Sequence, residues 1–277
     1  MSTLDSRLHA FRADLADSRL QGVIDAARFC EGEIREVSIP IASVRRGPVP
    51  DAMQTTQALL GERCRVFEVS EGWAWVQLEA DGYVGYIAES ALGAAGEATH
   101  RVSVPMTFIY PAPDIKSQPV TPAPMAARLA VRSAEGKFAR LASGFILMRH
   151  IAPIDSVESD FVSVAELFRH APYLWGGKSV AGLDCSGLVQ VALASAGIPC
   201  PRDTDMQEKA LGTPVASGEK LRRGDLVFWN GHVGIMTSAT DLLHANGHHM
   251  LTVIEPLAEA VARIGPVAGG ITAIKRL

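Results

Sequence analysis

Residues 184–193 read Asp-Cys-Ser-Gly-Leu-Val-Gln-Val-Ala-Leu, and this stretch decides the fold of the C-terminal half of the chain. Asp184 is of a type that caps helix N-termini, which places Cys185 in the first turn of a helix. Apolar residues then recur at helical spacing. Gly197 and Pro199 predict the end of the helix, because glycine adopts the left-handed closing conformation and proline cannot continue a helix. The sequence therefore predicts a helix that packs by one face and carries a cysteine at its amino end.

A cysteine in this place suits nucleophilic chemistry. The thiolate is the nucleophile, and a free thiol with a pKa near 8.5 is mostly protonated at neutral pH. A helix N-terminus and a nearby imidazolium both favour the thiolate, so we predict a depressed pKa for Cys185. Cys30, Cys64 and Cys200 are instead expected to be small buried apolar residues.

Two histidines follow on strands that the local sequence places. Asn230-Gly231 is a strong hairpin signal between the apolar runs 226–229 and 233–236, and a further strand is expected at about 241–246. If paired residue numbers sum to 476 or 478, His232 and His244 share a sheet face at roughly 4.5–8 Å. A slip of one residue would place them on opposite faces. The pattern predicts a nucleophile, a base and a group that orients the base.

The other histidines give a weaker signal. His248 and His249 follow the turn Asn246-Gly247, so we expect them to be exposed at a hairpin tip. His244 and His248 have the i,i+4 spacing of a zinc-binding helix, but the intervening turn disfavours a helix. We expect no metal and no cofactor.

Several short motifs together resemble one family. They are Pro172-Tyr173-Leu174-Trp175-Gly176-Gly177, Asp184-Cys185-Ser186-Gly187-Leu188, Gly224-Asp225-Leu226-Val227-Phe228-Trp229, Gly231-His232-Val233-Gly234-Ile235 and His244-Ala245. This set resembles the NlpC-type cell-wall peptidases, compact papain-like enzymes that cut peptidoglycan stem peptides. The resemblance covers about residues 155–277. It implies an α+β fold in which a helix packs on an antiparallel sheet.

The resemblance also implies roles for individual residues. Cys185 would attack the carbonyl, His232 would carry the proton and His244 would orient His232. Tyr173 would direct its hydroxyl at the developing oxyanion. Substrate contacts are implied for Trp175, Asp184, Ser186, Asp203 and Thr204. The alternative for Tyr173 and Trp175 is that both simply fill the core.

The first half of the chain has a different sequence pattern from the second. Short strands and Gly/Pro turns occur in two units of about fifty residues, which suits small barrels. The first unit resembles bacterial SH3-like domains closely, and the second does so loosely. The predicted organisation is a helical segment at 1–35, a first SH3-like barrel at 36–98, a second at 99–152 and the peptidase domain at 153–277.

Two such barrels ahead of this domain resemble one branch of the family. Its members are γ-D-glutamyl-L-diamino-acid endopeptidases that act on small muropeptides with a free N-terminal L-alanine. By this resemblance Glu62 and Tyr83 of the first barrel, with Asp203, would meet the substrate ammonium. The alternative for Glu62 is a solvated surface charge.

Composition is compatible with this reading. The chain has 277 residues, 48% of them hydrophobic and 20% charged, which allows more than one packed domain. The net charge of −4 gives no basis for nucleic-acid binding. Residues 1–35 carry many charges and no apolar signal core, so we expect a cytoplasmic protein that does not bind the membrane. The predicted partners are peptidoglycan-derived tri- or tetrapeptides in murein peptide recycling. A lysin or amidase acting on intact wall, and a wall-binding module, remain alternatives.

Overall fold

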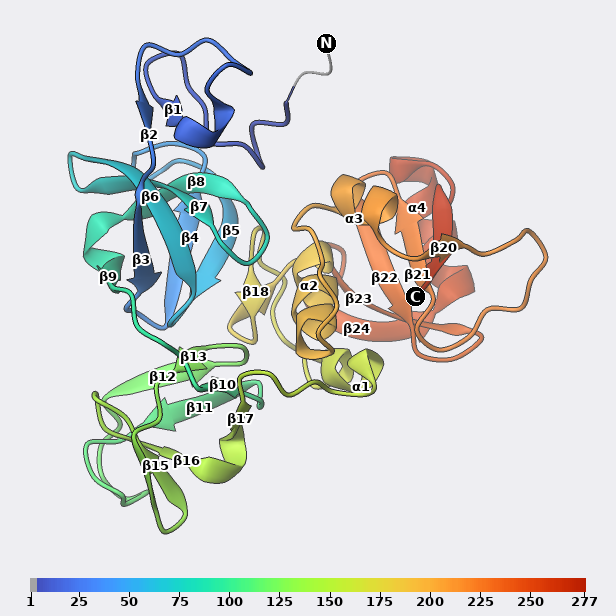
Figure 1. The fold of residues 1–277 in the computed structure, drawn as a ribbon. Helices are drawn as coiled ribbons and strands as arrows, with labels where there is room; N and C mark the ends of the chain where they lie inside the picture. Colours follow the sequence, from blue (N-terminus) through green and yellow to red (C-terminus); the bar gives the residue numbers. More distant parts are fainter. Residues whose placement is uncertain (1–3) are drawn as a thin grey trace. The chain divides into compact units, whose positions relative to one another are not determined.

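The structure is a computed structural model that describes residues 4–277 (Figure 1). The chain forms two compact units, one ending at Asp155 and one comprising Ser156–Leu277. The division falls three residues beyond the boundary expected after residue 152 (155 − 152 = 3). No helix among residues 4–277 combines the length and apolar character needed to cross a bilayer.

Residues 4–35 contain no α-helix, so the expectation of a helical N-terminal segment is wrong. Residues 4–32 contain the strands β1 (Ala16–Asp17) and β2 (Phe29–Cys30) and one turn of 3₁₀ helix, η1 (Ser18–Leu20). Of the apolar side chains expected to pack, Leu15 is buried, whereas Val23 is 64% exposed. Leu15 packs against Phe67 and Trp75 of the first barrel. Contact with that barrel, rather than helix propensity, decides the path of the segment.

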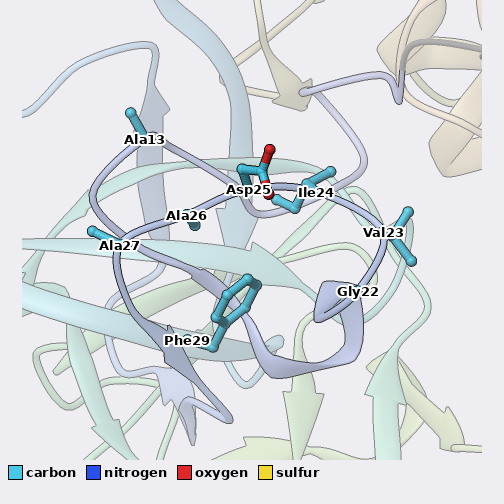
Figure 2. Close-up of a pocket in the computed structure, with 8 residues that line it drawn as sticks. All are labelled: Ala13, Gly22, Val23, Ile24, Asp25, Ala26, Ala27 and Phe29. Carbon is cyan, nitrogen blue, oxygen red and sulfur yellow. The ribbon is translucent and has the colours of Figure 1, made fainter.

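A hollow of about 720 Å³ lies within this N-terminal segment (Figure 2). The loop from Gly22 to Ala27 forms most of its wall, and Ala13 and Phe29 complete it. Asp25 is the one charged side chain in the lining. The hollow therefore offers no group of side chains that could act together in catalysis.

The first barrel is a seven-stranded antiparallel sheet with the order β5-β4-β8-β7-β6-β3-β9. Its strands are β3 (Glu33–Val37), β4 (Ile41–Arg45), β5 (Gln54–Leu59), β6 (Arg63–Ser70), β7 (Trp73–Leu78), β8 (Val84–Ala88) and β9 (Leu92–Ala94). Alternate residues are buried along β4 and β8, as expected for strands with one face in a core. Val44, Val76 and Ile87 belong to that core and are fully buried.

The second barrel consists of three small sheets around one core. Its strands are β10 (His100–Val102), β11 (Met106–Ile109), β12 (Thr121–Pro124), β13 (Arg128–Leu129), β14 (Ser133–Glu135), β15 (Phe138–Arg140), β16 (Phe145–Leu147) and β17 (Ile151–Pro153). Val102, Ile109 and Ile146 are buried members of this core. The Arg128 N–H donates to the Leu60 carbonyl at 2.8 Å. The second barrel thus contacts the turn of the first barrel that precedes Glu62.

The C-terminal unit combines a six-stranded sheet, of order β20-β25-β21-β22-β23-β24, with four helices (Figure 1). Its elements are α1 (Phe161–Glu166), β18 (Lys178–Ser179), β19 (Gly182–Leu183), α2 (Cys185–Ser195), α3 (Thr204–Ala210), β20 (Thr213–Pro214), β21 (Leu226–Trp229), β22 (His232–Met236), β23 (Asp241–Asn246), β24 (Leu251–Pro256), α4 (Leu257–Ala268) and β25 (Ala273–Arg276). Helix α2 packs on α1, β22 and β23, and α4 packs on β23 and β24. The expected α+β fold of a helix on an antiparallel sheet is confirmed.

The local predictions for this unit are confirmed in detail. Asp184 is the N-cap of α2, and Gly197 after the helix has a left-handed φ of +72°. The hairpin turn at Asn230-Gly231 joins β21 and β22 as expected. Strand β22 pairs with β23 through Ile235↔Leu243, a register whose residue numbers sum to 478. This register places His244 opposite Gly234, so that His232 is its diagonal neighbour on the same face.

Candidate active site

The start of α2 is held by the Asp184 carboxylate. Its Oδ1 accepts a hydrogen bond from the Gly187 N–H at 2.7 Å, and its Oδ2 accepts one from the Gly176 N–H at 2.8 Å. A Cβ atom at Gly187 would lie 2.2 Å from the Gly177 carbonyl oxygen. Glycine is therefore required for the first turn of α2 to pack on the turn at 176–177. This close packing fixes the backbone that carries Cys185.

A buried arginine completes this arrangement. Arg202 is 1% exposed and donates to both carboxylate oxygens of Asp184, at 3.0 and 2.7 Å. It also donates to Ser186 Oγ at 2.8 Å, and the Ser186 hydroxyl donates to Asp184 at 3.3 Å. Both side chains are buried, and their hydrogen bonds to Arg202 and to each other hold the start of the helix that carries Cys185. Contact of Asp184 and Ser186 with substrate stays a prediction.

Cys185 lies in a closed environment. Its side chain is 7% exposed, and its sulfur is 3.9 Å from Thr204 Oγ1. Burial and the Asp184 carboxylate raise the pKa of Cys185 to about 11. The thiolate is favoured by three groups, but they do not reverse the shift: the Val233 N–H, the Thr204 hydroxyl and Arg202. The predicted depressed pKa is therefore wrong for the free site. Burial outweighs the helix N-terminus, since removal from water penalises the charged form most.

The two histidines are in direct contact. His232 Nε2 lies 2.8 Å from His244 Nδ1, so the predicted shared face is confirmed. His244 is completely buried, and the His232 ring packs beside Trp229 with centroids 5.7 Å apart. Burial, and the neighbouring His244, lower the pKa of His232 to about 3. Burial also lowers the pKa of His244 to about 4, although Glu255 opposes the shift. Both shifts favour the neutral form of the ring.

The sequence reasoning missed one carboxylate in this cluster. His244 Nε2 lies 2.6 Å from Glu255 Oε1 on the neighbouring strand β24. Arg263 of α4 binds the same carboxylate with both of its Nη atoms. Burial opposes ionisation of Glu255, but hydrogen bonds from Arg263 and His244 outweigh it and lower its pKa to about 2. The available signal was an acidic residue within the apolar strand Leu251–Pro256.

The structure places the other predicted residues of this unit in different surroundings. Burial, followed by the charges of Cys185 and Asp184, raises the pKa of Tyr173 to about 12. Thr204 is buried beside that sulfur. Trp175 is 60% exposed, which excludes the alternative that it fills the core. Asp203 is half-buried and is the N-cap residue of α3.

Glu62 and Tyr83 belong to the other unit. Glu62 is 8% exposed and its Oε2 accepts a hydrogen bond from the Leu59 N–H at 3.0 Å. The alternative of a solvated surface charge is therefore wrong. Tyr83 is 5% exposed and lies in the core of the first barrel. Contact of these two residues with substrate stays a prediction.

Comparison with known proteins agrees with this geometry. Residues 170–262 match the NlpC/P60 family, and residues 44–92 match the bacterial dipeptidyl-peptidase SH3 domain. The chain therefore contains an SH3 domain followed by an NlpC/P60 domain. The NlpC/P60 match includes Cys185, both contacting histidines and Glu255. The SH3 match includes Glu62 and Tyr83.

Several curated relatives of this chain have peptidase names. Dipeptidyl-peptidase 6 of Lysinibacillus sphaericus is 32% identical over 122 residues, which is 42% of this chain and 44% of the relative. γ-D-Glutamyl-L-lysine dipeptidyl-peptidase of Bacillus cereus is 28% identical and is covered over 59% of its length. The Bacillus subtilis protein of the same name is 26% identical over 78% of this chain and 81% of its own. The chain thus spans about half the length of the first two relatives.

Solved structures show the same fold. An NlpC/P60 family protein from Bacillus cereus superposes with a TM-score of 0.74 at 20% identity, covering 88% of this chain and 99% of the other. An NlpC/P60 endopeptidase from Photobacterium damselae subsp. piscicida gives a TM-score of 0.62 at 14% identity, covering 86% and 70%. At these identities the likeness concerns the fold alone.

Proposed function

We propose that this NlpC/P60 protein is a cysteine endopeptidase that hydrolyses the γ-D-glutamyl-diaminopimelate bond of peptidoglycan stem peptides with a free N-terminal L-alanine. The observation that carries the proposal is the 2.8 Å contact between His232 and His244, in the unit where α2 begins at Cys185. Relatives named γ-D-glutamyl-L-lysine dipeptidyl-peptidase support the substrate class.

In the proposed reaction, His232 takes the thiol proton as the Cys185 sulfur attacks the γ-glutamyl carbonyl carbon. The Cys185 backbone N–H and the Tyr173 hydroxyl stabilise the oxyanion. His232 then gives the proton to the leaving amine, and a thioester remains. Water hydrolyses the thioester, with His232 taking the water proton and returning it to the sulfur as the carboxylic acid product leaves.

Burial of both reacting groups shapes the first step. The raised pKa of Cys185 and the lowered pKa of His232 favour the neutral thiol and the neutral imidazole before substrate binds. Proton transfer creates a thiolate and an imidazolium together, and these opposite charges stabilise each other strongly in a dry site. The reactive ion pair is therefore expected to form during the attack rather than to accumulate beforehand.

In this proposal, the protein selects short peptides by recognising the N-terminal ammonium of the substrate. In the proposal, Glu62 and Tyr83 of the first barrel, with Asp203, bind this group. Charge-assisted hydrogen bonds of this kind are worth about 1.5–3 kcal/mol each. A substrate with a blocked amine would lose these hydrogen bonds, and its added group would clash with the residues that bind the ammonium. We accordingly propose a role in cytoplasmic recycling of wall peptides.

The test compares four substrates with the full-length protein: L-Ala-γ-D-Glu-diaminopimelate, the lysine equivalent, the N-acetylated tripeptide and purified sacculi. We expect kcat/KM for the free tripeptides to exceed that for the acetylated peptide by at least about a hundredfold. Equal values for free and acetylated peptide would overturn the closed-site proposal in favour of a lysin or amidase. Binding of sacculi without turnover of any substrate would favour the wall-binding alternative.

A matched pair of variants separates Glu62 from general charge effects. Glu62→Gln should shrink the preference for the free amine, mainly by weakening the free-amine substrate. Glu79→Gln removes an exposed carboxylate from the same barrel and should leave the preference unchanged. An unchanged preference in Glu62→Gln would remove this residue from the ammonium site.

A further inference from the structure

Three polar side chains form a diagonal line across three adjacent strands. The β22–β23 register makes His232 a diagonal neighbour of His244. On the other side, β23 pairs with β24 through His244↔Val253 and Leu242↔Glu255, so Glu255 is also a diagonal neighbour of His244. All three therefore share one sheet face, and the contacts of 2.8 and 2.6 Å connect them in sequence.

The last member of this line has a defined charge. Arg263 donates to both oxygens of Glu255, one of them at 2.8 Å, and Glu255 itself is 9% exposed. A carboxylate held in this way can only accept hydrogen bonds. The nitrogen that faces it, His244 Nε2, must then carry a proton.

The proton on His244 decides the proton on His232. Because a neutral imidazole has one donor and one acceptor nitrogen, His244 Nδ1 becomes an acceptor. His232 Nε2 lies against that acceptor and must donate to it. The remaining nitrogen, His232 Nδ1, is left with a free lone pair. The Glu255 carboxylate, acting through His244, thus determines that Nδ1 is the basic nitrogen of His232.

We propose that Glu255, held by Arg263, is a positioning residue that fixes the tautomers of both histidines and so makes His232 Nδ1 the acceptor of the thiol proton. The proposal rests on the peptidase function proposed above. In the reaction the thiol proton moves to His232 Nδ1, and the ring becomes an imidazolium that keeps donating through Nε2 to His244. The negative charge of Glu255, on the far side of His244, stabilises this imidazolium. The proton then leaves with the amine product.

The first test reads the tautomers directly, without substrate. ¹⁵N NMR of the histidine rings in the full-length protein at neutral pH should show His244 and His232 both protonated at Nε2. His244→Gln and His232→Gln spectra assign the signals. Detection of His244 protonated at Nδ1 in the unaltered protein would overturn the proposal, whatever the variants do.

The second test removes the carboxylate. In Glu255→Ala we expect both rings to lose the single tautomer, with a growing share of His232 protonated at Nδ1, and kcat to fall about 10- to 100-fold with little change in KM. Losses of this size follow removal of partners behind metal-bound histidines. Glu255→Gln keeps an acceptor oxygen, so it should retain the Nε2–H tautomer and more of kcat than the alanine variant.

Glu259→Gln is the control, because Glu259 is exposed one helical turn before Arg263 on α4. It should leave both the tautomers and kcat unchanged. Unchanged tautomers in a folded Glu255→Ala variant would overturn the proposal. Absence of peptide hydrolysis by the unaltered protein, with the tautomers as expected, would instead overturn the proposed function and leave the assignment of Glu255 standing.

Discussion

Cys185 and the two contacting histidines are each backed by an arginine–carboxylate pair, and the two pairs have different hydrogen-bond partners. Behind Cys185, Asp184 gives its oxygens to the Gly176 and Gly187 backbone N–H groups and to Arg202. Behind His244, Glu255 gives its oxygens to Arg263 and to the imidazole itself. The first pair fixes the position of a backbone, whereas the second is inferred to fix the position of protons.

Exposure separates the two pairs further. Arg202 is 1% exposed, while the Arg263 side chain is 25% exposed. Removing one partner of a fully buried pair leaves an uncompensated charge, but water can partly replace a partner near the surface. Residue types alone would suggest the same role for both pairs. We therefore expect the Asp184–Arg202 pair to matter more for stability and, by the proposal above, the Glu255–Arg263 pair to matter more for catalysis.

The largest effect expected is on activity, and it should leave both pairs intact. Cys185→Ala and His232→Ala should each reduce kcat by at least about a thousandfold, and the double variant should be little worse, since members of such a unit are non-additive. Steady-state hydrolysis of the free tripeptide measures this. Melting temperatures close to that of the unaltered protein would show that the two supports stand without the reacting groups. A substantial residual rate in Cys185→Ala would exclude Cys185 as the nucleophile.

The next effect breaks the two pairs one at a time. Arg202→Met should lower the free energy of unfolding by about 3–5 kcal/mol, because it strands the buried Asp184 carboxylate. Arg263→Met should lower it by less, because Arg263 is 25% exposed and water can partly take its place beside Glu255. Urea unfolding followed by circular dichroism gives both values. Equal losses from the two variants would show that the difference in burial has no energetic meaning.

A smaller effect concerns the residue between the base and Glu255. His244→Gln keeps an amide oxygen that can accept the His232 N–H, so its kcat should stay within about tenfold of the unaltered protein. His244→Ala removes the acceptor and should lose about a hundredfold or more. The two rates under saturating tripeptide decide the matter. If the alanine variant were as active as the glutamine variant, His244 would have no orienting role.

The last effect is on stability in acid. The folded-state pKa values of His232 and His244, about 3 and 4, lie below the ordinary 6.5, so the unfolded chain binds more protons as pH falls below 6.5 and stability declines. Because the pKa of Glu255 is lowered from 4.5 to about 2 in the folded state, its carboxylate stabilises the fold at pH values above 4.5. This contribution is lost as the pH falls from about 4.5 to 2. Each excess proton contributes up to about 1.4 kcal/mol per pH unit.

Unfolding measured from pH 7 to 4 should therefore show a shallower decline in His244→Gln than in the unaltered protein. Glu255→Gln should differ from the unaltered protein most between about pH 4.5 and 2. If the free energy of unfolding fell identically with pH in all three proteins, His244 and Glu255 would not control the loss of stability in acid.

Local signals predicted the elements around the site well. The Asp184 cap, the glycine after α2 and the Asn-Gly hairpin act over a few residues, so their chemistry can be read directly from the chain. The shared face of His232 and His244 was also predictable, because a short connection between strands leaves few registers and a one-residue slip would reverse every side chain. Helix boundaries, strand pairing and the histidine contact therefore followed from the sequence.

The roles of the carboxylates and the state of the thiol depended on tertiary contacts. The sequence does not reveal that Arg202, sixteen or more positions away, donates hydrogen bonds to Asp184 and Ser186. Burial reversed the expected direction of the Cys185 pKa, and packing on the first barrel replaced the expected N-terminal helices. Local structure is decided by hydrogen bonds and propensities between near neighbours. Charge state and hydrogen-bond saturation are instead decided by whichever distant groups the fold places around a side chain, and by how much water it leaves there.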